Sequence, residues 1–367
     1  MKAAVCYEHD QPLVVEEVTL QAPQRGEVRV RMRATAICHS DIHLLRGDWR
    51  RLLPVVAGHE AAGIVEEVGE DVTIVNPGDH VVASLLRSCG RCFYCTTGSS
   101  HICEAEFALQ KEQRIHSLSG DPIYQGIYTG AFAEEIVVDQ SQLVPIPKEV
   151  PFESAALVAC GVITGFGAVV NTAKVPAHSS VVIIGAGGVG LNAVQGAVQS
   201  GAHPIITIDL IESKLEASHS FGATHSFNAA SQTNLAEAIR ELTSGRGADY
   251  VFVTVGSTTA LEQGLTLTRR DGTLVIVGIP PTEATAEIKM ASLVQGAGSY
   301  GGPTRILGSF MGSTRLSVDV PKLVDLYQQG GLMLDELISG QYPLEKINEA
   351  IEVVESGSVL RNVITFD

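Results

Sequence analysis

Four of the seven cysteines of this 367-residue chain are concentrated between positions 89 and 103, in the pattern Cys89-x2-Cys92-x2-Cys95-x7-Cys103. Four thiolates from one loop suit tetrahedral zinc and leave no coordination position for a substrate, which is typical of a structural site. A redox Cys-x-x-Cys pair and a nucleic-acid zinc knuckle are the alternatives. The formal net charge of −16 disfavours the knuckle, because it repels phosphate backbones.

A glycine-rich segment follows the apolar run 181–184 and opens a helical pattern that extends to about residue 200. Its glycines, Gly185, Gly187 and Gly190, have G-x-G-x-x-G spacing. The first glycine permits a tight turn, the second lets the backbone approach a pyrophosphate, and the third lets helix and strand pack closely. Free N–H groups at the helix N-terminus favour an anion there, so the segment predicts dinucleotide binding.

Asp209 ends the next apolar run, where a carboxylate can accept hydrogen bonds from the diol of an adenosine ribose. A 2′-phosphate would meet negative charge at this position, so we expect NAD rather than NADP, with Lys214 as a further ribose contact. The alternative is an ordinary strand-to-helix turn with a capping aspartate.

Three other metal-ligand side chains, Cys38, His59 and Cys160, are scattered along the chain. Taken singly, each is typical of a small buried thiol or a hydrogen-bonded core histidine. Spacing does not join them, so only the fold could bring them together.

The elements that must position these residues differ between the two halves of the chain. Up to about residue 151, short β-type runs (28–32, 63–68 and 80–83) alternate with turns and predict irregular, mostly antiparallel β-structure. Beyond residue 181, apolar strands at 181–184, 205–209, 250–255 and 274–277 alternate with helical patterns and predict a parallel sheet. The last part predicts helices at 320–329 and 344–356 and a strand at 362–366.

Composition narrows the function classes. Hydrophobic residues make up 45% of the chain and charged residues 18%, which excludes disorder as the main state. The acidic balance makes nucleic acid and membrane surfaces poor partners, and the first twenty residues show no signal-peptide pattern. Residues 154–173 are uncharged and long enough to span a bilayer, but their polar residues and glycines favour buried core. We therefore expect a cytoplasmic protein.

The sequence resembles the zinc-dependent alcohol dehydrogenases of the medium-chain dehydrogenase/reductase superfamily over essentially its whole length. The markers are Gly58-His59-Glu60 with Gly63 and Gly69, Gly78-Asp79, the four-cysteine cluster, and Gly185–Gly190 with Asp209. The resemblance implies an α/β fold, with a doubly wound parallel Rossmann sheet and a β-rich GroES-like catalytic domain carrying a structural zinc lobe. It places the catalytic domain at 1–153, with 301–367 returning to it, and the Rossmann domain at 154–300.

By the same resemblance, Cys38, His59 and Cys160 bind a catalytic zinc whose fourth position takes an alcohol. Asp41 orients the His59 imidazole, and Glu60 sits behind the metal and can exchange with its ligands. Ser40 and His43 match a proton relay, and Trp49 and Leu85 match the substrate pocket. Further positions match cofactor contacts: His39 and Arg361 at the pyrophosphate, Thr164 and Val189 at the nicotinamide, and also Gly188 and Val277.

The implied activity is reversible hydride transfer from an alcohol, expected to be primary, to NAD, giving an aldehyde or ketone. A non-zinc enone or quinone reductase of the same superfamily and a noncatalytic nucleotide-binding protein are the alternatives, and the intact metal set argues against the reductase. The family resemblance favours a homodimer, with a homotetramer as the second choice. The run 293–300 resembles the last Rossmann strand, whose edge could pair with that of a partner.

Overall fold

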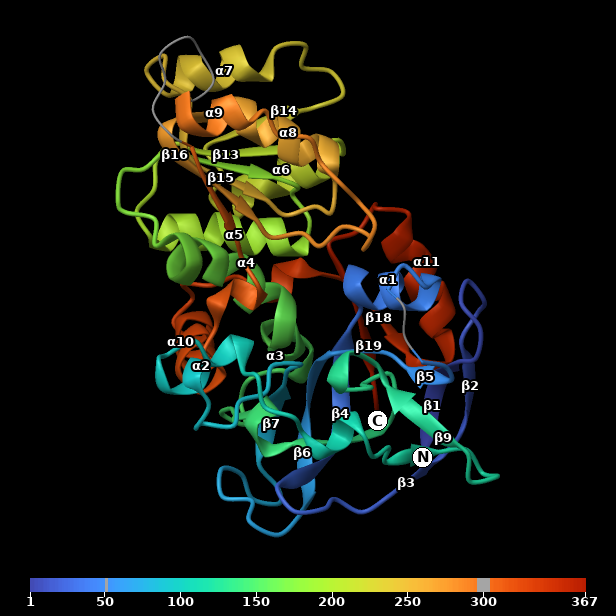
Figure 1. Ribbon diagram of the computed structural model, residues 1–367. Helices are drawn as coiled ribbons and strands as arrows, with labels where there is room; N and C mark the ends of the chain where they lie inside the picture. Colours follow the sequence, from blue (N-terminus) through green and yellow to red (C-terminus); the bar gives the residue numbers. More distant parts are fainter. Residues whose placement is uncertain (50–51, 296–303) are drawn as a thin grey trace. The chain divides into compact units, whose positions relative to one another are not determined.

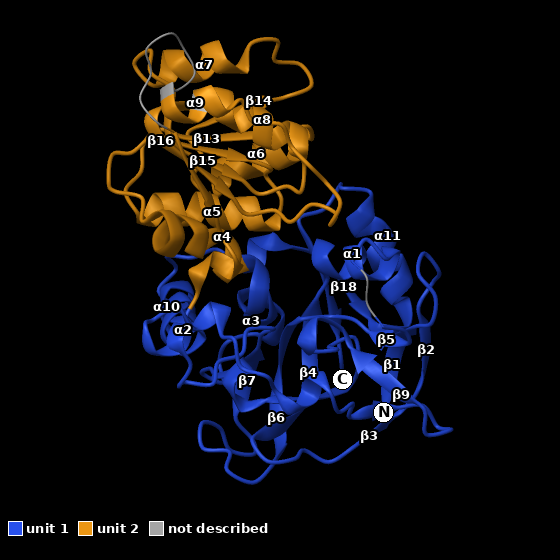
Figure 2. Ribbon diagram, viewed as in Figure 1, with its two compact units in different colours: residues 1–161, 315–367 blue, residues 162–314 orange. Residues whose placement is uncertain are grey.

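The computed structural model describes residues 1–49, 52–295 and 304–367, which form two compact units (Figures 1 and 2). The first unit comprises residues 1–161 and 315–367, and the second comprises residues 162–314. The predicted boundaries after residues 153 and 300 therefore differ from the observed ones. The segment that carries Cys160 belongs to the first unit, and the second unit extends to Thr314.

The first unit contains two β-sheets, whose strands pair mostly in the predicted antiparallel direction. One sheet has the order β11-β7-β6-β4-β19-β18, with β10 pairing with β4, and the other has the order β2-β1-β5-β9-β8-β3. The strands of the first sheet are β4 (Glu27–Ala36), β6 (Glu60–Val68), β7 (His80–Ala83), β10 (Glu135–Asp139), β11 (Leu143–Pro145), β18 (Ile338–Pro343) and β19 (Arg361–Thr365). Those of the second are β1 (Lys2–Cys6), β2 (Val14–Glu17), β3 (Thr19–Leu20), β5 (Val55–Val56), β8 (Ile115–His116) and β9 (Pro122–Gln125).

Strand β4 shows why this half folds as sheet. Val28, Val30 and Met32 are fully buried and alternate with arginines, which is the period of two that a half-buried strand requires. Two of the intervening arginines, Arg29 and Arg31, form ion pairs with carboxylates of the neighbouring strands β10 and β6.

The helices of the first unit are α1 (His39–Arg46), α2 (Phe93–Thr96), α3 (Phe152–Leu157), α10 (Leu316–Gln328) and α11 (Ile347–Glu355). The predicted C-terminal helices and final strand are confirmed as α10, α11 and β19. The uncharged stretch lies in a helical segment, Phe152–Ala173, that is long and apolar enough to cross a membrane. Within its most apolar window, 78% is buried inside the protein, so it is a core helix.

The second unit is a parallel sheet of the order β14-β13-β12-β15-β16-β17 with helices on it. Its strands are β12 (Val181–Ile184), β13 (Ile205–Asp209), β14 (His225–Asn228), β15 (Ala248–Val253), β16 (Thr268–Ile276) and β17 (Arg305–Gly308). Its helices are α4 (Ile163–Gly167), α5 (Gly188–Gln199), α6 (Glu212–Ser220), α7 (Leu235–Leu242), α8 (Thr258–Leu267) and α9 (Met290–Gln295). The four residues of β12 are all buried, as expected for a strand covered on both faces.

The predicted last strand, 293–300, is wrong in its first part, since residues 293–295 belong to helix α9. Among the described residues, the sheet ends on this side at β17, which pairs with β16 at Thr273 and Arg305. Residues 296–300 of the prediction lie outside the described residues.

Candidate active site

The register of three neighbouring strands brings Cys38, Glu60 and Arg361 together in the first unit. Ala36, the last residue of β4, pairs with Glu60 of β6 on one side and with Val363 of β19 on the other. One residue further along, the Ile37 N–H donates to the Asn362 carbonyl over 2.9 Å. Cys38 thus lies beside the beginnings of both neighbouring strands, although Glu60 and Arg361 are 301 positions apart.

Asp41 fixes the chain around this point from the first turn of α1. Its Oδ2 accepts the Cys38 N–H over 3.2 Å, and its Oδ1 accepts the Gly58 N–H over 2.9 Å. The same Oδ1 lies 2.9 Å from Nδ1 of His59. One fully buried carboxylate therefore joins the two segments that carry Cys38 and His59.

His59 is fully buried, and its two ring nitrogens differ. Nδ1 is bound to Asp41, whereas Nε2 has no hydrogen-bond partner among the described residues. Gly58 permits this placement, because its φ is +92° and a Cβ there would lie 2.6 Å from the Phe132 ring. A buried ring nitrogen without a hydrogen-bond partner is costly unless a ligand such as a metal ion satisfies it.

Cys160 completes a set of metal donors. The neighbouring Ala159 carbonyl accepts a hydrogen bond from the Ser84 hydroxyl over 2.6 Å, which anchors this turn to the end of β7. The donor atoms of Cys38, His59, Glu60 and Cys160 all lie within 4.8 Å of one another, and all four residues are buried. Two sulfurs and one imidazole suit zinc and leave room for a further ligand, so the residues fit an open zinc site.

The buried groups of this site shift one another's pKa values. Hydrogen bonding with Cys160 contributes most to holding the pKa of Cys38 well below its usual value, and His59 and Arg361 lower it further against the effect of burial. Burial lowers the pKa of His59, but Asp41 and Cys38 raise it overall. Binding of a metal ion at Nε2 would therefore displace a proton.

Glu60 and Arg361 form a buried ion pair. Burial raises the pKa of Glu60 to about 8, even though the Arg361 guanidinium acts in the opposite direction. The Arg361 guanidinium also lies against Gly161, where a Cβ would be 3.5 Å from it. The structure thus pairs Arg361 with Glu60, whose carboxylate is one of the four possible metal donors.

The second donor set consists of Cys89, Cys92, Cys95 and Cys103, whose sulfurs also lie within 4.8 Å of one another. None of the seven cysteines forms a disulfide. Backbone N–H groups point at the sulfurs, and the bond from the Cys95 N–H contributes most to lowering the pKa of Cys92 to about 6. Since helix α2 in this lobe buries none of its residues, four thiolates around a zinc ion fit the site better than a hydrophobic core would.

The glycine-rich loop joins β12 to α5 in the second unit. Gly185 has a φ of +100°, and a Cβ on Gly190 would lie 1.8 Å from the Gly185 carbonyl oxygen, so both positions require glycine. A Cβ on Gly187, by contrast, would meet no atom within 4 Å. That open space before the helix N-terminus fits the approach of a pyrophosphate.

Comparisons with known proteins agree with this geometry. Residues 24–148 match the alcohol dehydrogenase GroES-like domain, and residues 188–329 match the zinc-binding dehydrogenase family. S-(hydroxymethyl)glutathione dehydrogenase of Saccharomyces cerevisiae is 37% identical over 379 residues, covering 100% of this chain and 96% of that protein. The chain belongs to the zinc-dependent alcohol dehydrogenases of the medium-chain dehydrogenase/reductase superfamily.

Solved structures show the same fold over the whole chain. Benzyl alcohol dehydrogenase of Acinetobacter calcoaceticus has a TM-score of 0.90 at 33% identity, covering 100% of this chain and 99% of that one. A Sinorhizobium meliloti protein solved bound to NADP has a TM-score of 0.81 at 25% identity, again covering 100% and 99%. The predicted fold class, a Rossmann sheet with a GroES-like domain, is confirmed.

The dehydrogenase holds Asp209 firmly at the carboxyl end of β13. Its Oδ2 accepts the Ala186 N–H over 2.6 Å, and its Oδ1 accepts the N–H groups of Leu210 and Ile211 over 2.7 and 3.0 Å. Burial lowers the pKa of Lys214, on the helix that follows, against the effect of Asp209. The carboxylate therefore lies next to the glycine-rich loop, which the sequence could not show from spacing alone.

The other predicted site residues lie as follows. Thr164 is 9% exposed, and its hydroxyl donates to the Met311 sulfur over 3.6 Å within the second unit. In the same unit, Gly188 and Val189 begin α5 and Val277 is buried directly after β16. In the first unit, His39 is exposed and Ser40 and Leu85 are half-buried.

His43 has a partner that the sequence reading missed. Its Nδ1 lies 2.6 Å from Oδ2 of Asp48, and its ring is stacked on Trp49 with centroids 5.5 Å apart. The side chain of His43 remains 25% exposed. The signal that could have pointed to Asp48 is its position directly after the helix end, at Gly47, five residues beyond His43.

Proposed function

We propose that this dehydrogenase oxidises primary alcohols to aldehydes with NAD, and catalyses the reverse reduction. The observation that carries the proposal is the buried donor set of Cys38, His59 and Cys160 with the unpartnered Nε2 of His59. These three side chains would hold the catalytic zinc. When bound, zinc supplies the Lewis acidity that favours the alkoxide, and NAD accepts the hydride.

The chain's own residues orient and move the proton. The Asp41 carboxylate would accept a hydrogen bond from Nδ1–H of His59, so that Nε2 is left to face the metal position. Ser40 would take the alcohol proton and pass it towards His43, which is partly exposed and can release it to water. Asp48 fixes the tautomer and the direction of the His43 ring.

A primary alcohol is favoured by the chemistry of the relatives. The Acinetobacter protein is named for benzyl alcohol and the yeast protein for S-(hydroxymethyl)glutathione, and both molecules carry a CH2–OH group. Trp49 and Leu85 are the proposed pocket residues of this chain, and an indole so placed restricts the width of an alcohol.

NAD is favoured over NADP by Asp209. Its carboxylate is held by three backbone N–H groups, so it cannot easily turn away from a 2′-phosphate. Lys214 and the loop residues Gly185 to Gly190 would complete the adenosine and pyrophosphate contacts. His39 and Arg361 are the proposed pyrophosphate contacts. Because Arg361 is paired with Glu60, its guanidinium would have to bind the Glu60 carboxylate and the pyrophosphate at the same time.

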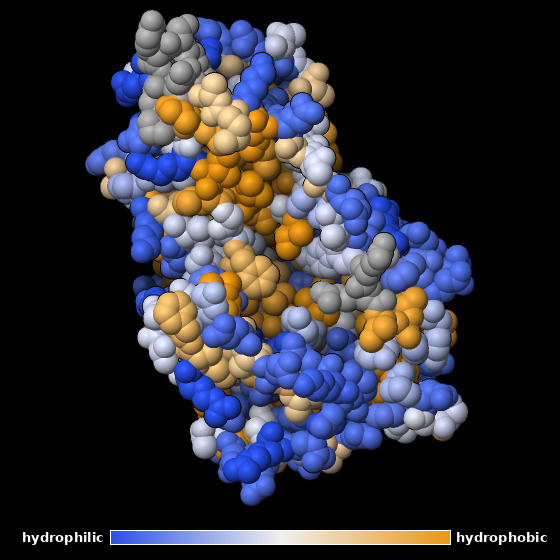
Figure 3. All heavy atoms as spheres, in the orientation of Figure 1, coloured by the Kyte–Doolittle hydropathy of each residue, from blue (hydrophilic) through white to orange (hydrophobic). Residues whose placement is uncertain are grey.

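We further propose a cytoplasmic homodimer. Strand β17 is the edge of the parallel sheet, and Met290, Val294 and Leu307 of α9 and β17 are exposed. Figure 3 shows apolar residues gathered on the surface of the second unit. Exposed apolar surface next to a sheet edge favours pairing with a second copy.

The test is turnover of a panel of primary, secondary and polyol alcohols by the zinc-loaded protein, followed by nicotinamide absorbance. We expect NAD reduction with primary alcohols to be fastest. Absence of alcohol-dependent NAD reduction by protein that contains zinc would overturn the proposed activity.

A further inference from the structure

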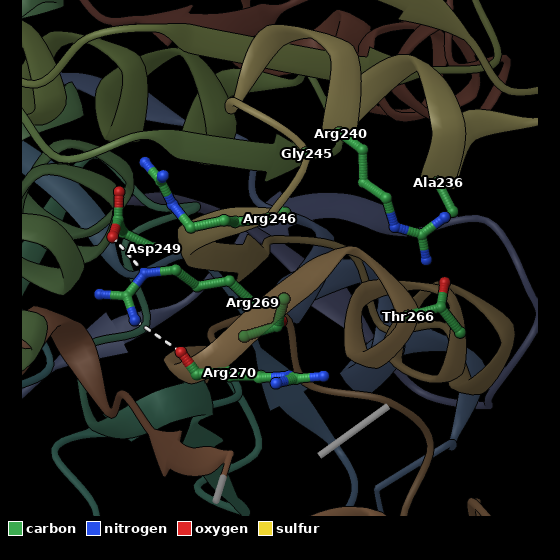
Figure 4. Close-up of a pocket in the computed structure, with 10 residues that line it drawn as sticks. Ala236, Arg240, Gly245, Arg246, Asp249, Thr266, Arg269 and Arg270 are labelled. Carbon is green, nitrogen blue, oxygen red and sulfur yellow. Dashed lines mark hydrogen bonds and ion pairs between the residues drawn. The ribbon is translucent and has the colours of Figure 1, made fainter. Parts of the chain in front are cut away.

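A cavity of about 600 Å³ lies in the second unit, away from the residues discussed so far. Four arginines line it, Arg240, Arg246, Arg269 and Arg270, together with one carboxylate, Asp249 (Figure 4). Residues 162–314 contain only one further arginine, Arg305. Such a concentration of positive charge, in a chain of net charge −16, favours the approach of an anion.

The chain is shaped locally to present these side chains. Ala248 pairs with Thr268, but Tyr250 pairs with Thr273, so β16 has three extra residues that bulge out of the sheet and carry Arg269 and Arg270. In the loop before β15, Ser244, Gly245 and Gly247 have φ values of +54°, +80° and +96°. A Cβ on Gly247 would lie 2.8 Å from the Leu267 carbonyl oxygen, so glycine lets the two arginine-bearing loops approach closely.

Two of the four guanidinium groups are already engaged. Arg269 forms an ion pair with Asp249, which is itself held by the Ser180 N–H over 2.7 Å and by the Ser180 hydroxyl over 2.6 Å. Arg240 lies 3.5 Å from Glu237. Figure 4 shows Arg246 and Arg269 near Asp249, and Arg240 and Arg270 on the side of Thr266.

The other two arginines, Arg246 and Arg270, are exposed and form no hydrogen bond or ion pair through their side chains with any described residue. Arginines placed only to neutralise acidic neighbours would be paired. Arginines that complement the C-terminal ends of α7 and α8 would donate to the last main-chain carbonyls of those helices. Arg269 donates to the Arg270 carbonyl within β16, over 2.5 Å. Neither explanation accounts for Arg246 and Arg270.

This cavity is distinct from the dinucleotide loop. It lies at the amino ends of β15 and β16, whereas Gly185 to Gly190 and Asp209 follow the carboxyl ends of β12 and β13 in the same parallel sheet. A six-residue strand such as β15 separates the two edges by about 20 Å. The lining residues include no aromatic side chain on which a base could stack.

We propose that this cavity binds a small molecule that carries two phosphate groups, one for each of the unpaired guanidinium groups. Arginine binds phosphate oxygens through paired N–H donors, and the volume is that of a typical small-molecule site. Both inorganic pyrophosphate and an organic bisphosphate offer this chemistry. The proposal does not depend on the dehydrogenase activity, because no proposed catalytic or cofactor residue lines the cavity.

The test is isothermal titration of the zinc-loaded, NAD-saturated protein with inorganic pyrophosphate and, separately, with a sugar bisphosphate. Saturating NAD blocks the dinucleotide loop, and zinc content is measured after each titration to exclude loss of metal. The variant is Arg246→Gln/Arg270→Gln, and the matched control is Arg25→Gln, which removes an exposed arginine of the first unit. Thermal melts of all three proteins without phosphate report any structural role.

We expect one saturable site per chain for at least one probe, weakened about tenfold or more in the double variant and unchanged in the control. Tighter binding of the sugar bisphosphate identifies an organic ligand, and tighter binding of pyrophosphate an inorganic one. No saturable binding of either probe, or binding that the double variant retains, would overturn the proposal. A fall in the melting temperature of the double variant without loss of phosphate binding would overturn it in favour of a structural role.

Discussion

Replacement of Asp41 tests most directly whether a change in zinc affinity can be distinguished from a change in the stability of the fold. Its two oxygens accept hydrogen bonds from Cys38 and Gly58 and contact Nδ1 of His59. In Asp41→Asn, a carbonyl oxygen in the place of Oδ1 keeps the contacts to Gly58 and His59, but the amide NH2 then faces the Cys38 N–H. One hydrogen bond to a charged group is lost, which costs about 1.5–3 kcal/mol of the free energy of unfolding.

The larger effect is expected on zinc. Loss of the negative charge behind His59 weakens the imidazole as a ligand, and replacement of such a partner costs about 10–100-fold in metal affinity. That range corresponds to about 1.4–2.7 kcal/mol of binding free energy. The four-cysteine site has no contact with Asp41 in the described structure, so only one of the two zinc ions should become labile.

The assay is zinc release to a colorimetric chelator, with alcohol oxidation measured in parallel. Asp48→Asn is the matched control, because it makes the same chemical change in an aspartate that contacts another histidine, His43, over 2.6 Å. The control should hold both zinc ions as tightly as the parent. Equal zinc affinity in Asp41→Asn and the parent, or equal loss in the two variants, would refute the role given to Asp41.

Three further outcomes are expected. His43→Gln should slow alcohol oxidation mainly at low pH, with partial rescue by added imidazole; a pH profile like that of the parent would remove His43 from the proton path. Asp209→Ser should lower the ratio of kcat/KM for NAD over NADP by about tenfold, the value of one hydrogen bond to a charged group; a parent enzyme that is already faster with NADP would contradict the assignment. Gly190→Ala should lower the free energy of unfolding by about 1–3 kcal/mol, because its Cβ would lie 1.8 Å from the Gly185 carbonyl oxygen. Gly187→Ala, whose Cβ meets no atom within 4 Å, should leave the melting temperature unchanged but weaken NAD binding, and identical behaviour of the two variants would refute this reading of the loop.

Features that depend only on residues close together in the sequence could be predicted. The four cysteines of the lobe are close in sequence, and the strand Val181–Ile184 is apolar throughout because both of its faces are covered. Strands β14 and β17 were missed, since β14 (His-Ser-Phe-Asn) is polar and β17 is a short edge strand. An edge strand that is not buried on both faces carries no continuous apolar signal.

The open metal site was not predictable from spacing, because it depends on strand register. Cys38 and Cys160 are brought together by the pairing of β4 with β6 and β19 and by the anchoring of Ala159 to Ser84. Only the family resemblance joined these residues into one site. The ion pair between Glu60 and Arg361 was not foreseen, since the two residues had been assigned separate roles. A buried ion pair between residues that are distant in the sequence cannot be predicted from local sequence patterns.

Three side chains from distant parts of the chain are expected to hold a catalytic zinc in addition to the structural one. The most direct measurement is the zinc content per chain of the parent and of Cys160→Ser, determined together with alcohol oxidation. We predict about two zinc ions and activity in the parent, and about one zinc ion with loss of activity in the variant. An active parent with fewer than two zinc ions per chain, or a variant that keeps both zinc ions and full activity, would contradict the account.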